Sequence, residues 1–367
     1  MSKRIVVKVG SSTLTGGGEG GLDRDYVQSL VDQIARIKSA GHEPVLVSSG
    51  AIAAGVSRLG LERRPTDMPS LQAAASVGQV ALIEMYAALF ASHGIAVGQV
   101  LLTRHDTGHR ESFLHARDTF ERLIGLGAVP IVNENDTVAV DEIRFGDNDT
   151  LAALVATMVN ADLVVLLSDI EGLYDADPRL VETATLLDSV DEVTDELLDA
   201  AGEAGSEHGS GGMATKLEAA RVLMRAGIPM VVCDGARGNV ICDAVDGRQA
   251  GTVFEPGAGS LGARKSWIAL GRRASGVVVI DEGATGALRH RKTSLLPAGV
   301  VAVEGTFVVG DAIVLMDEGR RVVGRGLAGL SSADIDLVKG LNSGEIAERY
   351  PGIAGTEVVH RDHLVVL

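Results

Sequence analysis

The stretch Ile5-Val6-Val7-Lys8-Val9-Gly10-Ser11-Ser12 joins a short apolar run to a turn of small polar residues. Such a run, bounded by glycine and serine, is typical of a strand buried on both faces of a parallel sheet. The same pattern recurs along the first 255 residues and predicts further strands. These are Pro44–Val47, Ile95–Leu102, Ala128–Val132, Leu163–Leu167 and Pro229–Cys233.

Helical patterns separate these strands. Asp23 is a suitable N-cap for the first of them, because apolar residues at helical spacing follow it. Regular alternation of strands and helices predicts the α/β class, here an αβα sandwich with a mainly parallel central sheet. The expected helices are residues 23–40, 70–92, 111–125, 149–160 and 213–226.

Polar clusters directly follow four of the expected strands. The carboxyl ends of parallel strands meet at one edge of such a sheet, and ligands usually bind there. Agreement among four strands therefore favours one shared ligand site over four unrelated loops. The clusters are Gly10-Ser11-Ser12, Ser48-Ser49-Gly50, Asn133–Asp136 and Ser168-Asp169.

The composition of the 367-residue chain narrows the class of protein. Hydrophobic residues make up 46% and aromatic residues only 3%, which suits parallel strands packed under helices. The length favours two domains. The formal charge of −16 makes the surface as a whole repel polyphosphate backbones and anionic membranes.

Two further features bear on the compartment. Cys233 and Cys242 form neither a CxxC motif nor a disulfide framework, which is consistent with a reducing environment. The N-terminus shows no cleavable signal pattern, and we expect no 18-residue apolar span elsewhere. The sequence therefore predicts a soluble cytoplasmic protein.

The character of the sequence changes near residue 256. Residues 256–275 carry four basic and no acidic residues, in contrast to the acidic region before them. From Gly276 onward, short β runs alternate with glycine, aspartate and proline, which predicts a compact and mostly β second domain. The runs are Val277–Ile280, Gly299–Val303, Ala312–Leu315 and Val322–Gly326.

Two clusters of acids and amides, Asn133-Glu134-Asn135-Asp136 and Gly146-Asp147-Asn148-Asp149, lie close together in the sequence. Asparagine and aspartate can hold the ammonium and carboxylate groups of a small zwitterion, or fix a lysine beside a phosphate. Asp149 is also suited to cap the helix 149–160, which gives it a structural alternative. Three successive polar side chains exceed what a cap requires.

Lys8 and Lys216 supply positive charge from distant parts of the sequence. Lys216 lies in the first turn of a helix behind a glycine-rich turn, where it opposes the helix dipole unless an anion compensates it. The spacing is not that of a Walker A loop. The alternatives are a snorkelling strand-end lysine for Lys8, a flexible loop at 209–216, N-capping by Ser48–Gly50 and a capped turn at Ser168–Tyr174.

These motifs together resemble those of the glutamate 5-kinases, which belong to the amino acid kinase fold family. The resemblance covers nearly the whole chain, because the region from about 276 resembles the PUA domain of many bacterial members. It implies a kinase domain at 1–258, a linker at 259–275 and a PUA domain at 276–355. The segments that carry it are VVKVGSSTLT, SSGAIAAG, NENDTV, FGDND, LLSDIEGLYDADPR and GSGGMATK.

The resemblance implies ATP-dependent phosphorylation of the γ-carboxylate of L-glutamate to L-glutamyl 5-phosphate, the first step of proline biosynthesis. Carried over by motif, Ser49, Asp136 and Asn148 would bind glutamate, and Lys216 would contact the phosphoryl group in transfer. Ser168 stands where threonine is common in the family, but the hydroxyl is retained. The residues implied for ATP are Lys8, Ser168, Asp169, Ser210, Gly211, Gly212, Met213, Ala214, Thr215 and Lys216.

The resemblance also implies partners. Mg²⁺ would accompany ATP, with no metal site built from protein residues, and proline would act as a feedback inhibitor. A homo-oligomer and functional coupling to glutamyl phosphate reductase are further implications. The main rival is another kinase of the same fold that acts on acetylglutamate, aspartate or uridylate.

PUA modules commonly bind RNA, which is a different class of function. Residues 276–367 hold nine Lys and Arg against twelve Asp and Glu, so this module lacks a basic footprint. The basic positions of the linker, Arg264, Lys265, Arg272 and Arg273, are the one candidate patch in the sequence. We expect no RNA binding and a regulatory or assembly role for the module.

The implied chemistry suits these side chains. A glutamate carboxylate has an ordinary pKa of about 4.3, so it is ionised at neutral pH and needs no general base. The difficulty is the approach of an anion to a polyanion, which positive charge relieves. We therefore expect Lys8 and Lys216 to flank the γ-phosphate as catalytic residues, with Asp149 orienting one or both of them.

Overall fold

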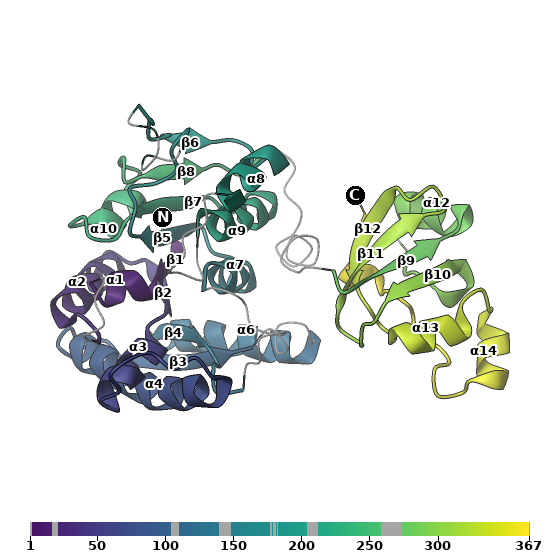
Figure 1. Ribbon diagram of the computed structural model, residues 1–367, viewed down its shortest axis with the longest axis horizontal. Helices are drawn as coiled ribbons and strands as arrows, with labels where there is room; N and C mark the ends of the chain where they lie inside the picture. Colours follow the sequence, from purple (N-terminus) through teal and green to yellow (C-terminus); the bar gives the residue numbers. More distant parts are fainter. Residues whose placement is uncertain are drawn as a thin grey trace. The chain divides into compact units, whose positions relative to one another are not determined.

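The computed structural model describes residues 2–16, 21–103, 110–138, 148–176, 178, 181, 183–203, 212–257, 274–291 and 293–366. The chain divides into two compact units, Met1–Ser260 and Leu261–Leu367. Each unit has its own sheet and its own hydrophobic core. Figure 1 labels most of the helices and strands of both units.

In the described residues of the N-terminal unit, eight strands form one sheet in the order β3-β4-β2-β1-β5-β7-β8-β6. Neighbouring strands run parallel, except that β7 and β8 are antiparallel. Thus β1 lies near the centre. The strands are β1 (Arg4–Val9), β2 (Glu43–Ser48), β3 (Val97–Leu102), β4 (Val129–Glu134), β5 (Leu163–Ser168), β6 (Ser189–Val190), β7 (Met230–Asp234) and β8 (Thr252–Phe254).

The strands expected from apolar runs are confirmed, with bounds shifted by at most two residues. These strands could be predicted because they are buried. Every residue of β4 and β5 is buried, and strands buried on both faces have largely continuous apolar sequences. Neither β6 nor β8 is expected from the sequence. These strands have two and three residues, too few to show a recognisable pattern.

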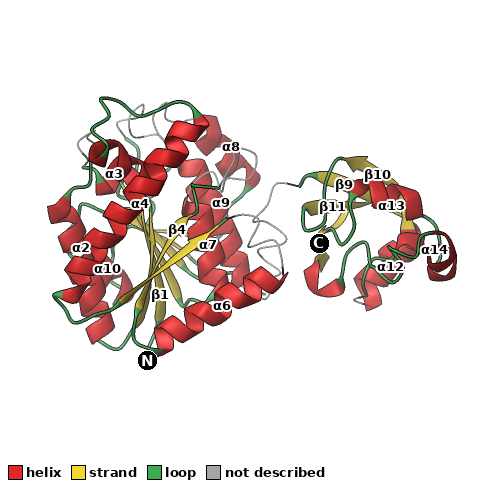
Figure 2. Ribbon diagram, turned by 90° about the horizontal axis from the view of Figure 1, so that it is seen from below, coloured by secondary structure: helices red, strands yellow, loops and turns green. Residues whose placement is uncertain are grey.

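Helices cover both faces of the sheet, as expected (Figure 2). α2, α4 and α10 pack on one face around a core that includes Val7 and Val9 of β1. α6, α7 and α9 lie on the other face. The helices are α1 (Ser11–Leu14), α2 (Arg24–Ser39), α3 (Ala51–Arg58), α4 (Met68–Ala91), α6 (Arg110–Gly125), α7 (Asn148–Met158), α8 (Asp195–Glu203), α9 (Met213–Ala226) and α10 (Val240–Val245).

Two glycines let α3 and α4 cross at backbone contact. A Cβ atom added to Gly55 would overlap the carbonyl oxygen of Ala74, and one added to Gly78 would overlap that of Ala51. A side chain at either position therefore requires the helices to separate. The crossing holds the N-terminus of α3, which directly follows β2, against the middle of α4.

The long helix α4 corrects one expectation from the sequence. Within the described residues it is the one helix long and apolar enough to cross a membrane by length and composition, so an 18-residue apolar span does exist. Gln72, Ser76, Gln79 and Glu84 interrupt its alanine-rich sequence. The helix therefore shows no unbroken apolar run, although its mean hydropathy is high. A core helix passes the same test, and one face of α4 is buried in the N-terminal unit through Ala74, Ala75, Gly78, Leu82, Tyr86, Leu89 and Phe90.

The described part of the C-terminal unit forms a five-stranded sheet in the order β10-β9-β11-β12-β13. The four β runs expected from the sequence are confirmed, and the sheet encloses a separate core that includes Val278, Leu315 and Val323. Its elements are β9 (Gly276–Ile280), β10 (Val300–Gly305), β11 (Ala312–Asp317), β12 (Val322–Leu327), β13 (Leu364–Val366), α12 (Glu282–Arg291), α13 (Ser332–Val338), α14 (Ser343–Arg349), and the 3-10 helices η1 (Pro297–Gly299) and η2 (Arg361–His363).

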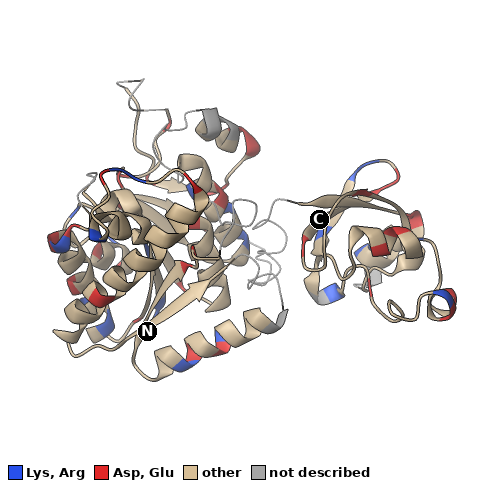
Figure 3. Cartoon of the chain, turned by 60° about the horizontal axis from the view of Figure 1, so that its bottom comes forward, with Lys and Arg blue, Asp and Glu red and all other residues tan. Residues whose placement is uncertain are grey.

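Three helices and β13 add to the expected C-terminal pattern. β13 lies beyond residue 355 and pairs with β12, so the sheet includes the last described residues of the chain. Acidic and basic positions are both distributed over the elements of this unit (Figure 3). The basic positions of the linker that the sequence singles out, 264, 265, 272 and 273, lie outside the described residues.

Candidate active site

Lys8, Asp149 and Lys216 meet in the N-terminal unit, on the face of the sheet that α7 and α9 cover. Lys8 of β1 forms an ion pair with Asp149 Oδ1, and Lys216 Nζ of α9 lies 3.1 Å from Asp149 Oδ2. The Asp149 side chain is fully buried, and the two lysine side chains are 6% and 7% exposed. The sequence hypothesis that the two lysines come together is confirmed.

Asp149 does not act as the helix cap that the sequence offers as its alternative role. α7 begins at Asn148, so Asp149 lies within the first turn, and its carboxylate is directed to the lysines. The residues of α7 from Asp149 onward are buried except Thr150. A helix buried on almost all sides places a charge out of water only when that charge is paired.

The N-terminus of α9 presents Lys216. Gly212 is the N-cap without a capping side chain, and Thr215 Oγ1 lies 2.8 Å from the Gly212 carbonyl oxygen and 3.3 Å from Asp149 Oδ2. Met213 and Ala214 are the first helical residues, while Ser210 and Gly211 lie outside the described residues. Asp149 supplies the anion that compensates Lys216 against the helix dipole.

The electrostatics of this cluster keep Asp149 ionised. Burial alone would raise the pKa of Asp149, but the charges of Lys8 and Lys216 and their hydrogen bonds outweigh burial. The pKa of Asp149 is therefore held below its usual range. Two cations and one anion leave the cluster with a net charge of about +1 at neutral pH, which suits an anionic ligand.

Ser49 and Asn148 lie together beside this cluster. Asn148 Nδ2 lies 2.7 Å from Ser49 Oγ, 3.1 Å from the Ser48 carbonyl oxygen and 3.1 Å from Asn133 Oδ1. Asn133 Nδ2 in turn donates to Gln79 Oε1 of α4 at 2.9 Å. Gly50, with φ of +93°, is the N-cap of α3 and no side chain caps that helix, so the Ser48–Gly50 turn is not a side-chain cap.

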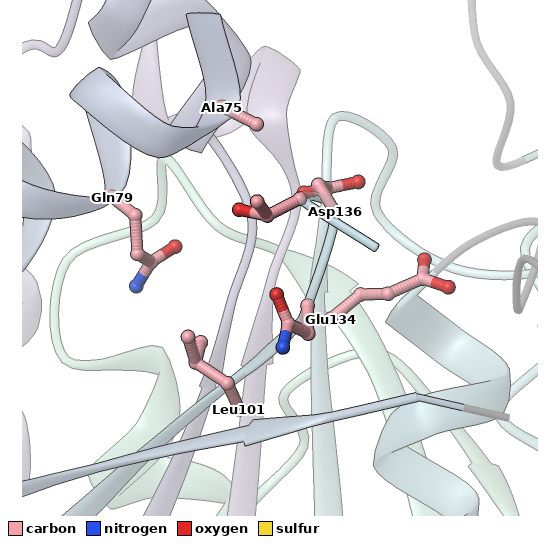
Figure 4. A pocket seen from close by; sticks show the side chains of 7 residues that line it. Ala75, Gln79, Leu101, Glu134 and Asp136 are labelled. Carbon is pink, nitrogen blue, oxygen red and sulfur yellow. The ribbon is translucent and has the colours of Figure 1, made fainter. Parts of the chain in front are cut away.

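Asp136 lines a small hollow at the end of β4 (Figure 4). It follows the buried Asn133 and Glu134 and is itself half-buried. The hollow holds the second half of the Asn133–Asp136 cluster beside one face of α4. Its lining residues are Ala75, Gln79, Leu101, Glu134, Asn135, Asp136 and Thr137.

Ser168 and Asp169 lie on the other side of β1, at the end of β5. Ser168 is buried and donates to Asp169 Oδ1 at 3.2 Å, while Asp169 is exposed. The strand order β4-β2-β1-β5 therefore places the acid and amide clusters on one side of Lys8 and this pair on the other. Two neighbouring subsites with Lys8 between them are what a transfer between two reactants requires.

The structure adds Gln79 to the residues singled out from the sequence and gives Asn133 a definite place between Asn148 and Gln79. Asn133 belongs to a cluster already recognised, and its burial marks it as a connector rather than a surface amide. Gln79 carries a weaker signal, since it interrupts the apolar stripe that Ala75, Leu82 and Tyr86 form on α4. A polar residue within a helix's buried stripe is the informative exception.

The described residues contain no group of three or more His, Cys, Asp or Glu side chains that could hold a metal ion. Asp149 is already engaged by two ammonium groups. Where Mg²⁺ accompanies a nucleotide, phosphate oxygens and water usually supply most of its ligands, together with one or two carboxylates.

Two family models match the two units of the chain. A model described as the amino acid kinase family matches residues 3–234, and one described as the PUA domain matches residues 276–350. A solved structure of a UMP kinase from Ureaplasma parvum aligns with a TM-score of 0.49 at 16% identity, over 70% of this chain and 99% of that chain.

Relatives of known name align over nearly the full length. The chain is 48% identical to the glutamate 5-kinase of Streptomyces avermitilis, over 100% of this chain and 97% of the relative. It is 44% identical to the glutamate 5-kinase of Thermoanaerobacter pseudethanolicus, over 99% and 98% of the two chains. The chain belongs to the amino acid kinase family and, within it, to the glutamate 5-kinases that carry a C-terminal PUA domain.

Proposed function

We propose that this protein phosphorylates the γ-carboxylate of L-glutamate with ATP, giving L-glutamyl 5-phosphate for proline biosynthesis. The observation that carries the proposal is the buried Lys8–Asp149–Lys216 cluster beside an acid and amide pocket. Its relatives at 44–48% identity are named glutamate 5-kinases, which favours glutamate over the acetylglutamate, aspartate or uridylate of related kinases.

The nucleophile needs little help from the protein. The γ-carboxylate is ionised at neutral pH, so no side chain has to remove a proton from it. Catalysis then consists of aligning the carboxylate with the γ-phosphorus and stabilising the charge that spreads over the phosphoryl oxygens. A reaction that needs positive charge but no general base agrees with a cluster of two lysines and one aspartate.

Lys8 and Lys216 are assigned to the transferred phosphoryl group and its neighbours. Their ammonium groups share Asp149, so both are held within a few ångströms of one point before ATP binds. Preorganised charges stabilise a transition state without the cost of reorganisation during the reaction. Asp149 is therefore proposed to orient the lysines rather than to contact the phosphate.

Ser49, Asn148 and Asp136 are assigned to glutamate. Asn148 uses its NH₂ group on protein acceptors, which leaves its amide oxygen to accept from the substrate ammonium. The half-buried carboxylate of Asp136 provides an anionic partner for the same ammonium. These contacts form before and during transfer alike, so they set affinity more than rate.

Ser168, Asp169 and the 210–216 segment are assigned to the nucleotide, which would enter on the β5 side of Lys8. Mg²⁺ bound to the β- and γ-phosphates supplies additional neutralisation of the polyphosphate. We further propose a homo-oligomer in the cytoplasm, feedback inhibition by proline, functional coupling to glutamyl phosphate reductase, and a regulatory rather than RNA-binding role for the PUA domain.

The decisive experiment traps the product. The purified enzyme is incubated with Mg-ATP, hydroxylamine and glutamate, and glutamyl hydroxamate is measured beside ADP release. We expect hydroxamate that depends on glutamate, with aspartate, acetylglutamate and UMP giving at most a small fraction of the rate. ADP release with another acceptor, and none with glutamate, would refute the assignment.

A further inference from the structure

Gly235 directly follows β7 and is packed more closely than a side chain would allow. It is buried, and a Cβ atom added there would lie 2.8 Å from Thr13 Cγ2 and 2.9 Å from the hydroxyl oxygen of Tyr26. Carbon atoms in contact are ordinarily about 3.5–4.0 Å apart. The φ angle of Gly235 is not positive, so alanine could adopt the same backbone conformation. Glycine is therefore needed at this position for space, not for backbone freedom.

Gly235 reaches α1 across one intervening strand. β5 lies between β1 and β7, so the strands that precede α1 and Gly235 are about 10 Å apart. The backbone N–H of Gly235 donates to the Ser168 carbonyl oxygen at 2.8 Å, which holds the turn over the end of β5. From this place the Gly235 backbone contacts Thr13 of α1. A side chain here would have to fit between the turn and α1.

The turn that follows β1 connects this contact to Lys8. α1 is a single helical turn of four residues that directly follows Gly10. The position of a Cβ atom on Gly10 lies 3.7 Å from Lys8 Nζ and 3.9 Å from Thr13 Oγ1, so these two side chains flank the same glycine. A displacement of Thr13 therefore changes the immediate surroundings of the Lys8 ammonium group.

The turn between β7 and α10 is held in place by hydrogen bonds of its own. Asp234 Oδ1 accepts from the backbone N–H of Ala236 at 2.8 Å, and Arg237 Nη1 donates to the Gln249 carbonyl oxygen at 3.0 Å. A helix of one turn has little stability of its own, so α1 would yield first to a larger residue at 235. If the turn moved instead, its hydrogen bond to the end of β5 would be lost. Both responses disturb residues that are assigned to ATP.

We propose that Gly235 is a positioning residue for phosphoryl transfer. Because it carries no side chain, the turn after β7 can support α1 beside Lys8 and Ser168, and Gly235 itself does not contact the substrate. The residues assigned to glutamate, Ser49 and Asn148, lie on the other side of β1 and should be affected little. The inference rests on the proposed function and extends it to a turn that no sequence motif singles out.

Gly235→Ala and Gly238→Ala are a matched pair of variants. Both glycines lie between β7 and α10 without a positive φ, but nothing lies within 4 Å of a Cβ atom added to Gly238. We expect Gly235→Ala to lower kcat/KM for ATP about tenfold or more, because a misplacement of about 1 Å can cost about 10²-fold in rate. The KM for glutamate should change little, and Gly238→Ala should match the wild type.

Hydroxamate formation with varied ATP and varied glutamate measures these constants. Calorimetric titration with ATP in the absence of glutamate gives Kd as a readout that does not depend on turnover. Melting temperatures of all variants verify that the fold is intact. If Gly235→Ala does not fold, Thr13→Ile enlarges the same contact from α1 and carries the same expectations.

A Thr13→Ser/Tyr26→Phe background tests whether the contact itself is the cause. It removes the two atoms nearest to a Cβ atom at position 235. The Tyr26 hydroxyl has no hydrogen-bond partner among the described residues, so its loss should cost little stability. In this background Gly235→Ala should change kcat/KM for ATP by about threefold or less, because substitutions in contact are not additive.

Three results would overturn the inference. Equal kcat/KM for ATP in Gly235→Ala and Gly238→Ala would show that the contact has no effect on the reaction. An equal loss with and without the Thr13→Ser/Tyr26→Phe background would show that another contact is responsible. Equal losses for ATP and glutamate would indicate a general loss of packing. A wild-type enzyme that makes no hydroxamate from glutamate would instead refute the proposed function, so the two failures are distinguishable.

Discussion

Lys8, Asp149 and Lys216 show how single residues from β1, α7 and α9 make one electrostatic unit. Each lysine is almost fully buried, and Asp149 is entirely so. Removing one partner from a buried ion pair costs about 3–5 kcal/mol, because the remaining charge is left uncompensated. The stability of the N-terminal unit therefore depends on all three charges of the cluster being present.

Lys216→Ala tests the catalytic role at the residue scale. We expect kcat to fall about 10²–10³-fold, because a preorganised charge at the phosphoryl group is lost, while the KM for glutamate changes little. Arg221→Ala on the same helix is the control, since Arg221 pairs with a largely exposed Asp195. An unchanged kcat in Lys216→Ala, measured by hydroxamate formation, would contradict the role.

Asp136→Ala tests the substrate subsite. The contact with the substrate ammonium is made in the ground state and in the transition state alike, so its loss should raise the KM for glutamate and leave kcat nearly unchanged. Steady-state kinetics with varied glutamate at saturating ATP measure both constants. A loss confined to kcat would show that this assignment is wrong.

Asp149→Asn tests the origin of the depressed pKa. Burial would raise the pKa of Asp149, but the two ammonium groups hold it below its usual range. A carboxyl of this kind stabilises the fold above its unfolded pKa of about 3.9, and the stabilisation is lost as the pH falls through the lower folded value.

We therefore expect the wild type to exceed Asp149→Asn in unfolding free energy by a constant amount from about pH 6 to 8, with the difference shrinking only below about pH 4. Urea unfolding at several pH values measures the difference. A difference that changes between pH 6 and 8 would contradict a carboxylate that is ionised throughout this range.

At the scale of elements, the crossing of α3 and α4 fixes the position of the proposed amino-acid subsite. α3 begins immediately after Ser49 and Gly50, and α4 contributes Gln79. The crossing depends on Gly55 and Gly78, whose missing side chains allow backbone contact. The positions of the two helices are therefore coupled through these two glycines.

Gly78→Ala should destabilise the N-terminal unit by about 1–3 kcal/mol, because the added methyl group forces the helices apart. The KM for glutamate should also rise, because Ser49, which is assigned to glutamate, directly precedes α3. Gly125→Ala is the control, because nothing lies within 4 Å of its added Cβ atom. Thermal unfolding and kinetics give both readouts, and equal stability of the two variants would argue against the crossing.

The elements differ in how well the sequence predicts them. Buried parallel strands such as β1 and β5 are visible as apolar runs, and α2 is visible through its cap Asp23, whose carboxylate accepts from two backbone N–H groups. β6 owes its strand geometry to pairing with β8, and β8 to pairing with β6 and β7, rather than to local pattern. Such tertiary effects override propensity and leave little trace in the sequence.

The candidate site also has a part that the sequence predicts and a part that only the fold shows. Motifs single out Lys8, Asp149 and Lys216, but only the fold shows that one carboxylate bridges both lysines. Gln79 lies far from every motif in the chain, and its meaning comes from Asn133, a long-range partner on β4. Relations between distant residues are therefore the part that sequence patterns do not encode.

On the scale of the whole molecule, the two units are built independently. Every described residue of the candidate site belongs to the N-terminal unit. The C-terminal unit has a core of its own, with Val278, Leu315 and Val323 fully buried. Neither sheet continues into the other.

A chain that ends at residue 257 tests this independence. We expect it to keep kcat within about threefold of the full-length value, because two separately packed cores of ordinary domain size fold as separate units. Hydroxamate formation and circular dichroism of the shortened protein measure activity and folding. Loss of soluble, active protein would show that the PUA domain is structural.

Asn148 and Asp149 are consecutive residues at the start of α7, and the proposed function assigns them to different halves of the reaction. Asn148 contacts Ser49 on the proposed glutamate side, and Asp149 holds Lys8 and Lys216 on the proposed phosphate side. The two Cα atoms are about 3.8 Å apart across one peptide unit, so the two groups of contacts are held at a fixed separation. Because their partners Lys8, Lys216 and Ser49 lie on other elements, a shift of that one turn would disturb the contacts of both side chains at once.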